Sequence, residues 1–131
     1  MKKAYPVIMS RDGEWIVVDI PDFEIGTQGK DFADAMEMAR DAMGMVGIVL
    51  EDEGKQLPEP SALESVNRSA GEIATLVDVD FTEYRRQNDL RTVRRNVSLP
   101  SWLDSAAKQA NINVSALLAN ALKQELHLSD A

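Results

Sequence analysis

Short apolar runs of the kind that form β-strands occupy the first part of the chain. Residues 5–9 predict one strand, residues 10–13 a turn, and the β-branched run at 15–20 the returning strand of a hairpin. The Pro-Asp pair at 21–22 ends this strand, because proline has no N–H to donate to a sheet. Residues 25–29 predict a short third strand.

A helical period follows the strands. Asp31 can cap this helix, with Asp34 in its first turn, and Gly54 suits its end. The apolar positions that recur at helical spacing are Phe32, Ala35, Met36, Ala39, Met43, Val46 and Leu50. Residues 42–50 are apolar on every side, which packing on one sheet face does not explain. This half is therefore either sandwiched against a partner or partly a strand, and we favour the helix.

One more strand completes the pattern. Residues 55–69 hold two prolines and several polar side chains, and predict a loop with, at most, a short helix. Residues 73–81 predict the fourth strand, and Thr82 can cap a single helical turn that reaches about Asn88. The order β-β-β-α-β is that of an α+β unit.

An alternation of apolar and polar residues, typical of a β-strand, returns near the C-terminus and is followed by two helical patterns. A strand over 93–99 would place Val97 and Leu99 on one face. The side chains on its other face are Arg94, Asn96 and Ser98. Helical patterns follow at 101–110 and 113–126.

One strand and two helices cannot by themselves bury the strand's apolar face or pair its backbone edges. Two copies can, if their strands pair antiparallel across a two-fold axis, so we expect a homodimer or a higher even oligomer. The ribbon would present Arg94, Asn96 and Ser98 to the major groove, where Arg pairs with guanine and Asn with adenine. The residues at the start of the second helix whose N–H groups can hold a phosphate are Asn113, Val114 and Ser115. A ribbon that only dimerises is the alternative.

Charge divides the chain in the same place. The 131 residues carry a net charge of −8, but residues 1–83 carry −11 and residues 84–131 carry +3. Five arginines and one acid lie within 84–95. This asymmetry indicates an acidic body with a small basic tail, although a solvated linker would also explain the arginine run. The predicted division is a body at 1–84, a basic linker at 85–91 and a tail module at 92–131.

Composition excludes several chemistries. The chain has no cysteine and one histidine, which excludes disulfides, a cysteine nucleophile, thiolate zinc sites and histidine metal cages. No apolar run approaches the roughly 18 residues of a membrane span, and the N-terminus has no apolar signal-peptide core. We expect a cytoplasmic protein that uses no cofactor or metal and binds no membrane.

The tail resembles the ribbon-helix-helix family of DNA-binding proteins. The resemblance covers residues 93–126, on RRNVSLP and then SWLDSAAKQANINVSALLANALKQEL. Strand alternation, the Leu-Pro exit and the spacing of the two helices all agree with it, and it implies binding to double-stranded operator DNA. Arg95 departs from the pattern, because the family usually has an apolar residue there. The start of the ribbon therefore either frays or places Arg95 on a phosphate.

The body resembles the HicB antitoxin family over roughly residues 4–84. The segments that carry the resemblance, besides the hairpin, are IPD at 20–22, TQG at 27–29, FADA at 32–35, LPEPS at 57–61 and LVDVD at 76–80. The short connection at 23–25 departs from the family, since it lacks the second proline often found there.

The HicB resemblance implies a partial ribonuclease-H-like fold that binds HicA, a small basic toxin that cleaves RNA. The chain would then be an antitoxin and a repressor of its own operon. The charge of −11 on the body suits a partner that must itself attract RNA, although excess acid can equally keep the body soluble. Residues 42–50 are a candidate for self-association or toxin contact, with core packing as the alternative.

Two other functions stay open. One is a stand-alone ribbon-helix-helix repressor whose body senses a ligand or only oligomerises. The other is a metal-dependent nuclease, because Asp19 with Asp22, and Asp78 with Asp80, are paired acids of the kind that can hold magnesium. Such spacings are common in so acidic a body, and no histidine or lysine lies beside these acids in sequence. We therefore expect no catalysis.

Overall fold

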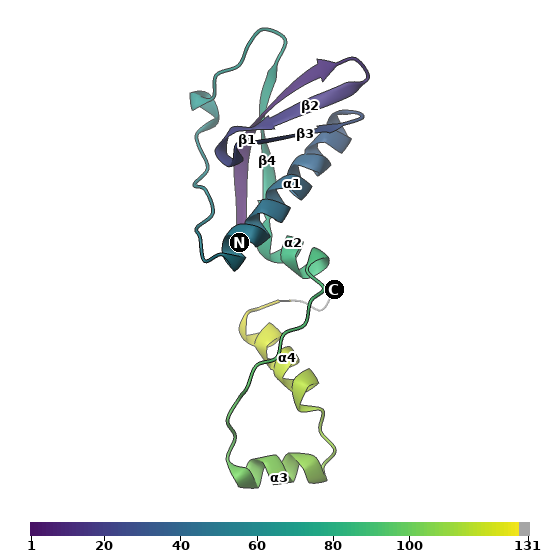
Figure 1. The fold of residues 1–131 in the computed structure, drawn as a ribbon, viewed down its shortest axis with the longest axis vertical. Helices are drawn as coiled ribbons and strands as arrows, with labels where there is room; N and C mark the ends of the chain where they lie inside the picture. Colours follow the sequence, from purple (N-terminus) through teal and green to yellow (C-terminus); the bar gives the residue numbers. More distant parts are fainter. Residues whose placement is uncertain (129–131) are drawn as a thin grey trace. The chain divides into compact units, whose positions relative to one another are not determined.

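A four-stranded antiparallel sheet forms the centre of the first of two units (Figure 1). The computed structural model describes residues 1–128, and the chain divides into Met1–Arg91 and Thr92–Ala131. The element order of the first unit is β-β-β-α-β, followed by a second helix. This order confirms the predicted α+β class.

The strands of the first unit follow the sequence patterns closely. β1 (Lys2–Asp12) and β2 (Trp15–Ile20) form the hairpin, and β2 continues through the short turn η1 (Pro21–Phe23) to β3 (Ile25–Gly29). β4 (Ile73–Asp80) pairs with the other side of β1. The sheet order is β3-β2-β1-β4, so β3 and β4 are its edges. β1 is longer at both ends than its apolar run predicts.

The long helix α1 (Phe32–Asp52) covers one face of the sheet (Figure 1). Asp31 caps it as predicted: its Oδ1 accepts the Asp34 N–H at 2.8 Å, and the Asp34 carboxylate accepts the Lys30 N–H at 2.8 Å in return. Gly54 follows the end of the helix with a φ of 70°, a left-handed conformation that suits glycine. Both predicted ends of this helix are confirmed.

The core of the first unit lies between the sheet and α1. The Phe23 and Phe81 rings lie 4.8 Å and 6.3 Å from the Tyr5 ring, centroid to centroid, in edge-on contacts. The other buried core residues are Val7, Met9, Ile16, Val18, Ile20, Ala35, Ala39, Met43, Val77 and Val79. The Tyr5 hydroxyl donates to the Pro58 carbonyl at 2.7 Å and so ties the loop after α1 to the core. That loop contains the expected short helix, a 3-10 turn η2 (Leu63–Ser65).

The helix α2 (Phe81–Asn88) follows β4 directly and packs against α1. Its N-cap is Asp80, whose Oδ1 accepts the Glu83 N–H at 3.2 Å. The prediction of Thr82 as the cap is therefore wrong. The helix starts earlier because Phe81 enters the core at the end of the strand.

Two glycines account for one side of residues 42–50, the side that faces α2. Gly44 and Gly47 of α1 face α2 rather than solvent. A Cβ at Gly44 would overlap the Tyr84 ring, and one at Gly47 would overlap the Phe81 ring. Only glycine lets the two helices approach this closely. The segment is a helix, as favoured from the sequence, that packs on the sheet and on α2. Its Met45 and Val49 are exposed, so this packing does not account for their apolar character.

The predicted linker at 85–91 is arranged differently from the expectation. Residues up to Asn88 belong to α2, and the first unit extends to Arg91. Arg85 and Arg91 form ion pairs with Asp52 at the end of α1. The acids of the body therefore engage arginines that the sequence pattern assigned to a separate basic segment.

The second unit contains the two predicted helices, α3 (Ser101–Gln109) and α4 (Val114–Glu125). Asn113 caps α4, since its Oδ1 accepts the Ala116 N–H at 3.0 Å. Asn111, between the helices, has a left-handed φ of 54°. Among residues 1–128, no helix is long and apolar enough to cross a membrane.

The strand predicted over 93–99 is not formed in this single chain. Residues 92–100 contain neither helix nor strand (Figure 1). A strand is held by hydrogen bonds to a neighbouring strand, and the neighbour predicted from the sequence belongs to a second copy. The two helices are therefore present without the ribbon.

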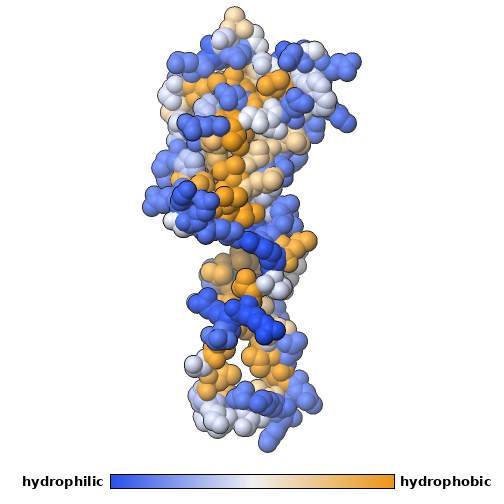
Figure 2. Space-filling model, viewed as in Figure 1, coloured by the Kyte–Doolittle hydropathy of each residue, from blue (hydrophilic) through white to orange (hydrophobic). Residues whose placement is uncertain are grey.

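None of the described side chains of the second unit is buried. Apolar side chains lie on its surface (Figure 2). Trp102 is 72% exposed, Leu126 63% and Leu117 57%. The two helices thus have amphipathic sequences without an interior to bury their apolar sides.

Candidate functional sites

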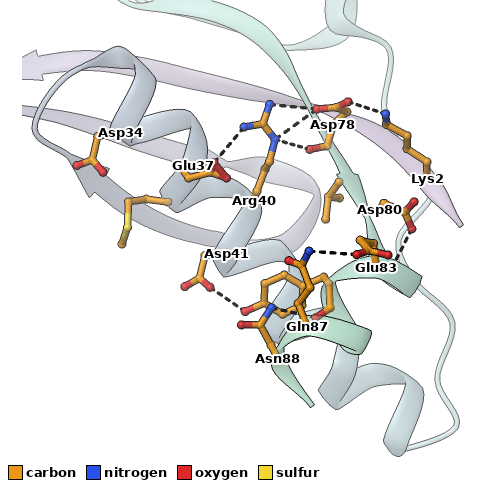
Figure 3. A pocket seen from close by; sticks show the side chains of 13 residues that line it. Lys2, Asp34, Glu37, Arg40, Asp41, Asp78, Asp80, Glu83, Gln87 and Asn88 are labelled. Atoms are coloured by element: carbon orange, nitrogen blue, oxygen red, sulfur yellow. Dashed lines mark hydrogen bonds and ion pairs between the residues drawn. The ribbon is translucent and has the colours of Figure 1, made fainter. Parts of the chain in front are cut away.

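An open groove of about 530 Å³ lies between α1, β4 and α2 of the first unit (Figure 3). Its acids outnumber its bases, and α1 contributes Asp34, Glu37 and Asp41 from one side. The other acids are Asp78, Asp80 and Glu83, and the bases are Lys2 and Arg40. The apolar residues of the lining are Met38, Val79 and Tyr84. The groove is therefore an acidic surface with apolar patches.

Asp78 is the most fully paired acid of the groove. Arg40 Nη2 lies 3.1 Å from its Oδ1, and Lys2 Nζ lies 3.3 Å from its Oδ2. The hydrogen bond from Arg40, followed by that from Lys2, lowers the pKa of the Asp78 carboxyl. Arg40 Nε also donates to the Asp78 carbonyl at 3.0 Å, which covers part of the exposed edge of β4.

Two further acids hold α2 in place. Asp80 caps α2 by accepting the Glu83 N–H, and this hydrogen bond is the main cause that lowers the pKa of the Asp80 carboxyl. Asp41 accepts the Tyr84 hydroxyl at 2.8 Å, and burial together with this carboxylate raises the pKa of Tyr84 to about 12. These groups are set for structure and charge rather than for proton transfer near neutral pH.

Three of the four acids considered for a nuclease, Asp22, Asp78 and Asp80, serve structural contacts, and the fourth, Asp19, is exposed. The Asp22 carboxylate accepts the Ser61 N–H at 2.8 Å and the Ser61 hydroxyl at 2.5 Å. Asp78 is held by two cations, and Asp80 caps α2. Within residues 1–128, no group of three or more acidic or histidine side chains is arranged to hold a metal ion.

The groove is a feature that the sequence patterns did not identify, although a signal was present. Asp34, Glu37 and Asp41 recur at spacings of three and four, which places them on one side of a helix. The contributions of Glu83 and Tyr84 could not be read in the same way, because they depend on how α2 packs against α1.

The residues proposed for DNA contact all lie in the second unit and are exposed. Those of the predicted ribbon, in the irregular segment before α3, are Arg94, Arg95, Asn96 and Ser98. Asn113, Val114 and Ser115 lie at the start of α4. The Asn113 side chain satisfies the Ala116 N–H, and helix geometry leaves the N–H groups of the first turn before Ala116 without an acceptor within the helix. The single chain does not assemble the flat polar ribbon.

Comparison with known proteins places both units in one family. A model of the HicB-like antitoxin of bacterial toxin-antitoxin systems matches residues 5–122. The chain belongs to the HicB-like antitoxin family. The match runs through the body and most of the tail, so the antitoxin role applies to a chain that contains both. No curated protein sequence matches it.

Solved structures of toxin-antitoxin proteins share the fold. A toxin-antitoxin complex from Streptococcus pneumoniae is similar with a TM-score of 0.60 and 24% identity, over 95% of this chain and 99% of that one. The Burkholderia pseudomallei antitoxin HicB is similar with a TM-score of 0.51 and 27% identity, over 95% of this chain and 96% of that one. The HicA3 and HicB3 toxin-antitoxin complex is similar with a TM-score of 0.51 and 25% identity, over 60% of this chain and 99% of that one.

Proposed function

We propose that this HicB-like antitoxin neutralises a small, basic, HicA-like toxin through its first unit and represses its own operon in the cytoplasm through its second. The observation that carries the proposal is the family match over residues 5–122, because it includes both units. The chain acts in this proposal by binding, without catalysis.

The acidic groove supports toxin binding through the first unit. A toxin that cleaves RNA must present positive charge to the RNA backbone, and an acidic surface complements that charge. Glu37 and Glu83 line the groove from different helices (Figure 3), and Met38 adds an apolar side chain to its lining. Such a surface would steer the toxin and cover the region that otherwise attracts RNA.

The exposed helices of the second unit support DNA binding as a homodimer or a higher even oligomer. A unit that buries no described side chain needs a second copy to form an interior. If the segments at 93–99 of two copies pair, Arg94, Asn96 and Ser98 repeat on one polar face that fits a major groove. Arg95 and the start of α4, from Asn113 to Ser115, would then contact phosphates.

Growth tests the antitoxin half of the proposal. Any short reading frame adjacent to this gene that encodes a basic protein is expressed alone and together with this chain. We expect growth arrest by the neighbour alone and recovery on co-expression. A harmless neighbour would instead favour a stand-alone repressor whose first unit senses a ligand or oligomerises.

Charge substitutions in the groove test where the toxin binds. Replacing Glu37 and Glu83 by Gln should weaken toxin binding in calorimetry, mainly by slowing association. The matched control is the double substitution of Glu14 and Glu64 by Gln, which removes the same charge outside the groove. Equal affinity of the two double variants would exclude the groove as the contact surface.

Base-contact substitutions test the DNA half. Arg94→Ala or Asn96→Ala should each cost about 1–3 kcal/mol of operator affinity in titrations with promoter DNA. Arg68→Ala, which removes a positive charge from the loop of the first unit, serves as the control. Operator binding by both tail variants with the affinity of the unmodified chain would refute the ribbon assignment.

A further inference from the structure

A compact group of charged side chains lies where the first unit ends, and we call it the arginine clasp: Arg85, Arg91, Asp52 and Asp89. Asp52 bridges the two arginines, since Oδ1 accepts from Arg85 Nη2 at 3.0 Å and Oδ2 from Arg91 Nη2 at 3.0 Å. Asp89 bridges them again: its Oδ2 accepts from Arg85 Nη1 at 2.9 Å and from Arg91 Nη2 at 2.8 Å, and its Oδ1 accepts from Arg91 Nε at 2.7 Å.

The two arginines of the clasp are held very differently. Arg85 is 30% exposed and also contacts α1 through the Ile48 carbonyl at 3.3 Å and Glu51 Oε2 at 3.2 Å. A cation beside the last carbonyls of a helix is favoured by the helix dipole. Arg91 is 64% exposed and is held only by Asp52 and Asp89 among its described contacts. Arg85 is thus the fixed part of the clasp, and Arg91 is the part that can open.

Arg91 occupies a special place in the chain, because the second unit begins at Thr92. It precedes Arg94, the first proposed base-contact residue, by three positions, which is a reach of roughly 10 Å in extended backbone. A released Arg91 would therefore lie close to the phosphates that flank the DNA site. In the clasp, two carboxylates neutralise its charge instead.

We propose that the clasp masks Arg91 as a phosphate-binding residue, so that DNA and the acids of the body compete for its guanidinium. This inference rests on the proposed DNA-binding function of the second unit. Exposed ion pairs are individually weak and are screened by salt, so a phosphate can replace them. The clasp therefore restrains DNA affinity without contacting DNA.

A double substitution tests the competition with a probe that needs no operator. The chain with Asp52→Asn and Asp89→Asn is titrated against a random-sequence DNA duplex at several salt concentrations. We expect a several-fold gain in affinity and a log–log salt slope that is more negative by about 0.9, the value for one added phosphate contact. Adding Arg91→Ala to this variant should return the slope to that of the unmodified chain.

Two controls separate release of Arg91 from loss of negative charge and from damage to the fold. The chain with Glu53→Gln and Glu64→Gln loses the same charge from the first unit but leaves the clasp intact, since Glu53 pairs with Lys55. Its salt slope should stay that of the unmodified chain. Amide hydrogen exchange should rise over residues 85–91 in the clasp variant and stay unchanged elsewhere in the first unit.

The outcomes distinguish the inference from the function on which it rests. If the unmodified chain binds DNA and the clasp and control variants share one slope, masking is overturned while DNA binding stands. If the slope steepens but Arg91→Ala does not reverse it, another cation is responsible and the role of Arg91 is overturned. If the unmodified chain binds neither promoter nor random duplex, the repressor function is overturned, and the masking role with it.

Discussion

The first unit buries its apolar side chains within one chain, whereas the second leaves its own on the surface. Tyr5 and Val7 have no exposed area, but Trp102 is 72% exposed and Leu122 51%. Both units carry regular apolar periods in sequence, so periodicity alone does not reveal this difference. The size of each unit explains the difference, because a strand and two helices are too small to enclose a core, whereas a four-stranded sheet with a long helix is large enough. The first unit is therefore expected to fold alone, whereas the proposed dimer would supply the interior that the second unit lacks in a single chain.

The largest expected effect follows from removing the partner surface of the second unit. If two copies associate as proposed, Leu122→Asp should prevent their association and destabilise the second unit, because a carboxylate would have to be buried between them. Sedimentation should report a monomer, and thermal unfolding followed by circular dichroism should show a less stable second unit. Asn120→Asp, a polar site of the same helix, is the control. A monomeric variant whose second unit is as stable as that of the unmodified chain would break the comparison.

A substitution in the first unit should weaken folding without any dependence on concentration. Gly47→Ala places a methyl group into the Phe81 ring, and such overpacking costs about 1–3 kcal/mol or more. Urea unfolding of the first unit measures it. Phe81→Leu in the same chain should recover part of the loss, since the two sites are in contact. Additive costs would show that the glycine is not required by this ring.

Much of the first unit could be predicted from the sequence because its elements obey local rules. The β-branched run of β2 and the Asp31 cap both depend on neighbours within a few residues. The packing of Gly44 under Tyr84 could not be predicted, since it joins residues far apart in the chain. The acidic side of α1 was visible as a spacing, but the groove appears only once α2 is placed. For the second unit, local rules identify both helices, whereas the ribbon depends on a molecule outside the chain and stays a prediction.

Alkaline pH should destabilise the first unit selectively, because both tyrosines of the chain, Tyr5 and Tyr84, lie in it. Burial raises the pKa of each from 10.0 to about 12. The folded state holds these protons more tightly than the unfolded chain does. Their contribution to the free energy of unfolding is therefore complete below pH 10 and is lost as pH rises through about 12. Urea unfolding at successive alkaline pH values should show this loss, and Tyr84→Phe should reduce it. An equal loss in that variant would assign the effect to other groups.

The smallest expected effect is that of removing the second unit on toxin binding, and it tests whether toxin and DNA bind to separate units. A chain that ends at Arg91 keeps the core, the acidic groove and the arginine clasp, because all of them lie in the first unit. It should fold alone and bind the toxin identified by the growth test with an affinity within about a factor of two of the full chain, a difference of roughly 0.4 kcal/mol. Calorimetry with that toxin measures it. A large loss would mean that the toxin also contacts the second unit, and the two units would then share one binding surface instead of dividing toxin and DNA between them.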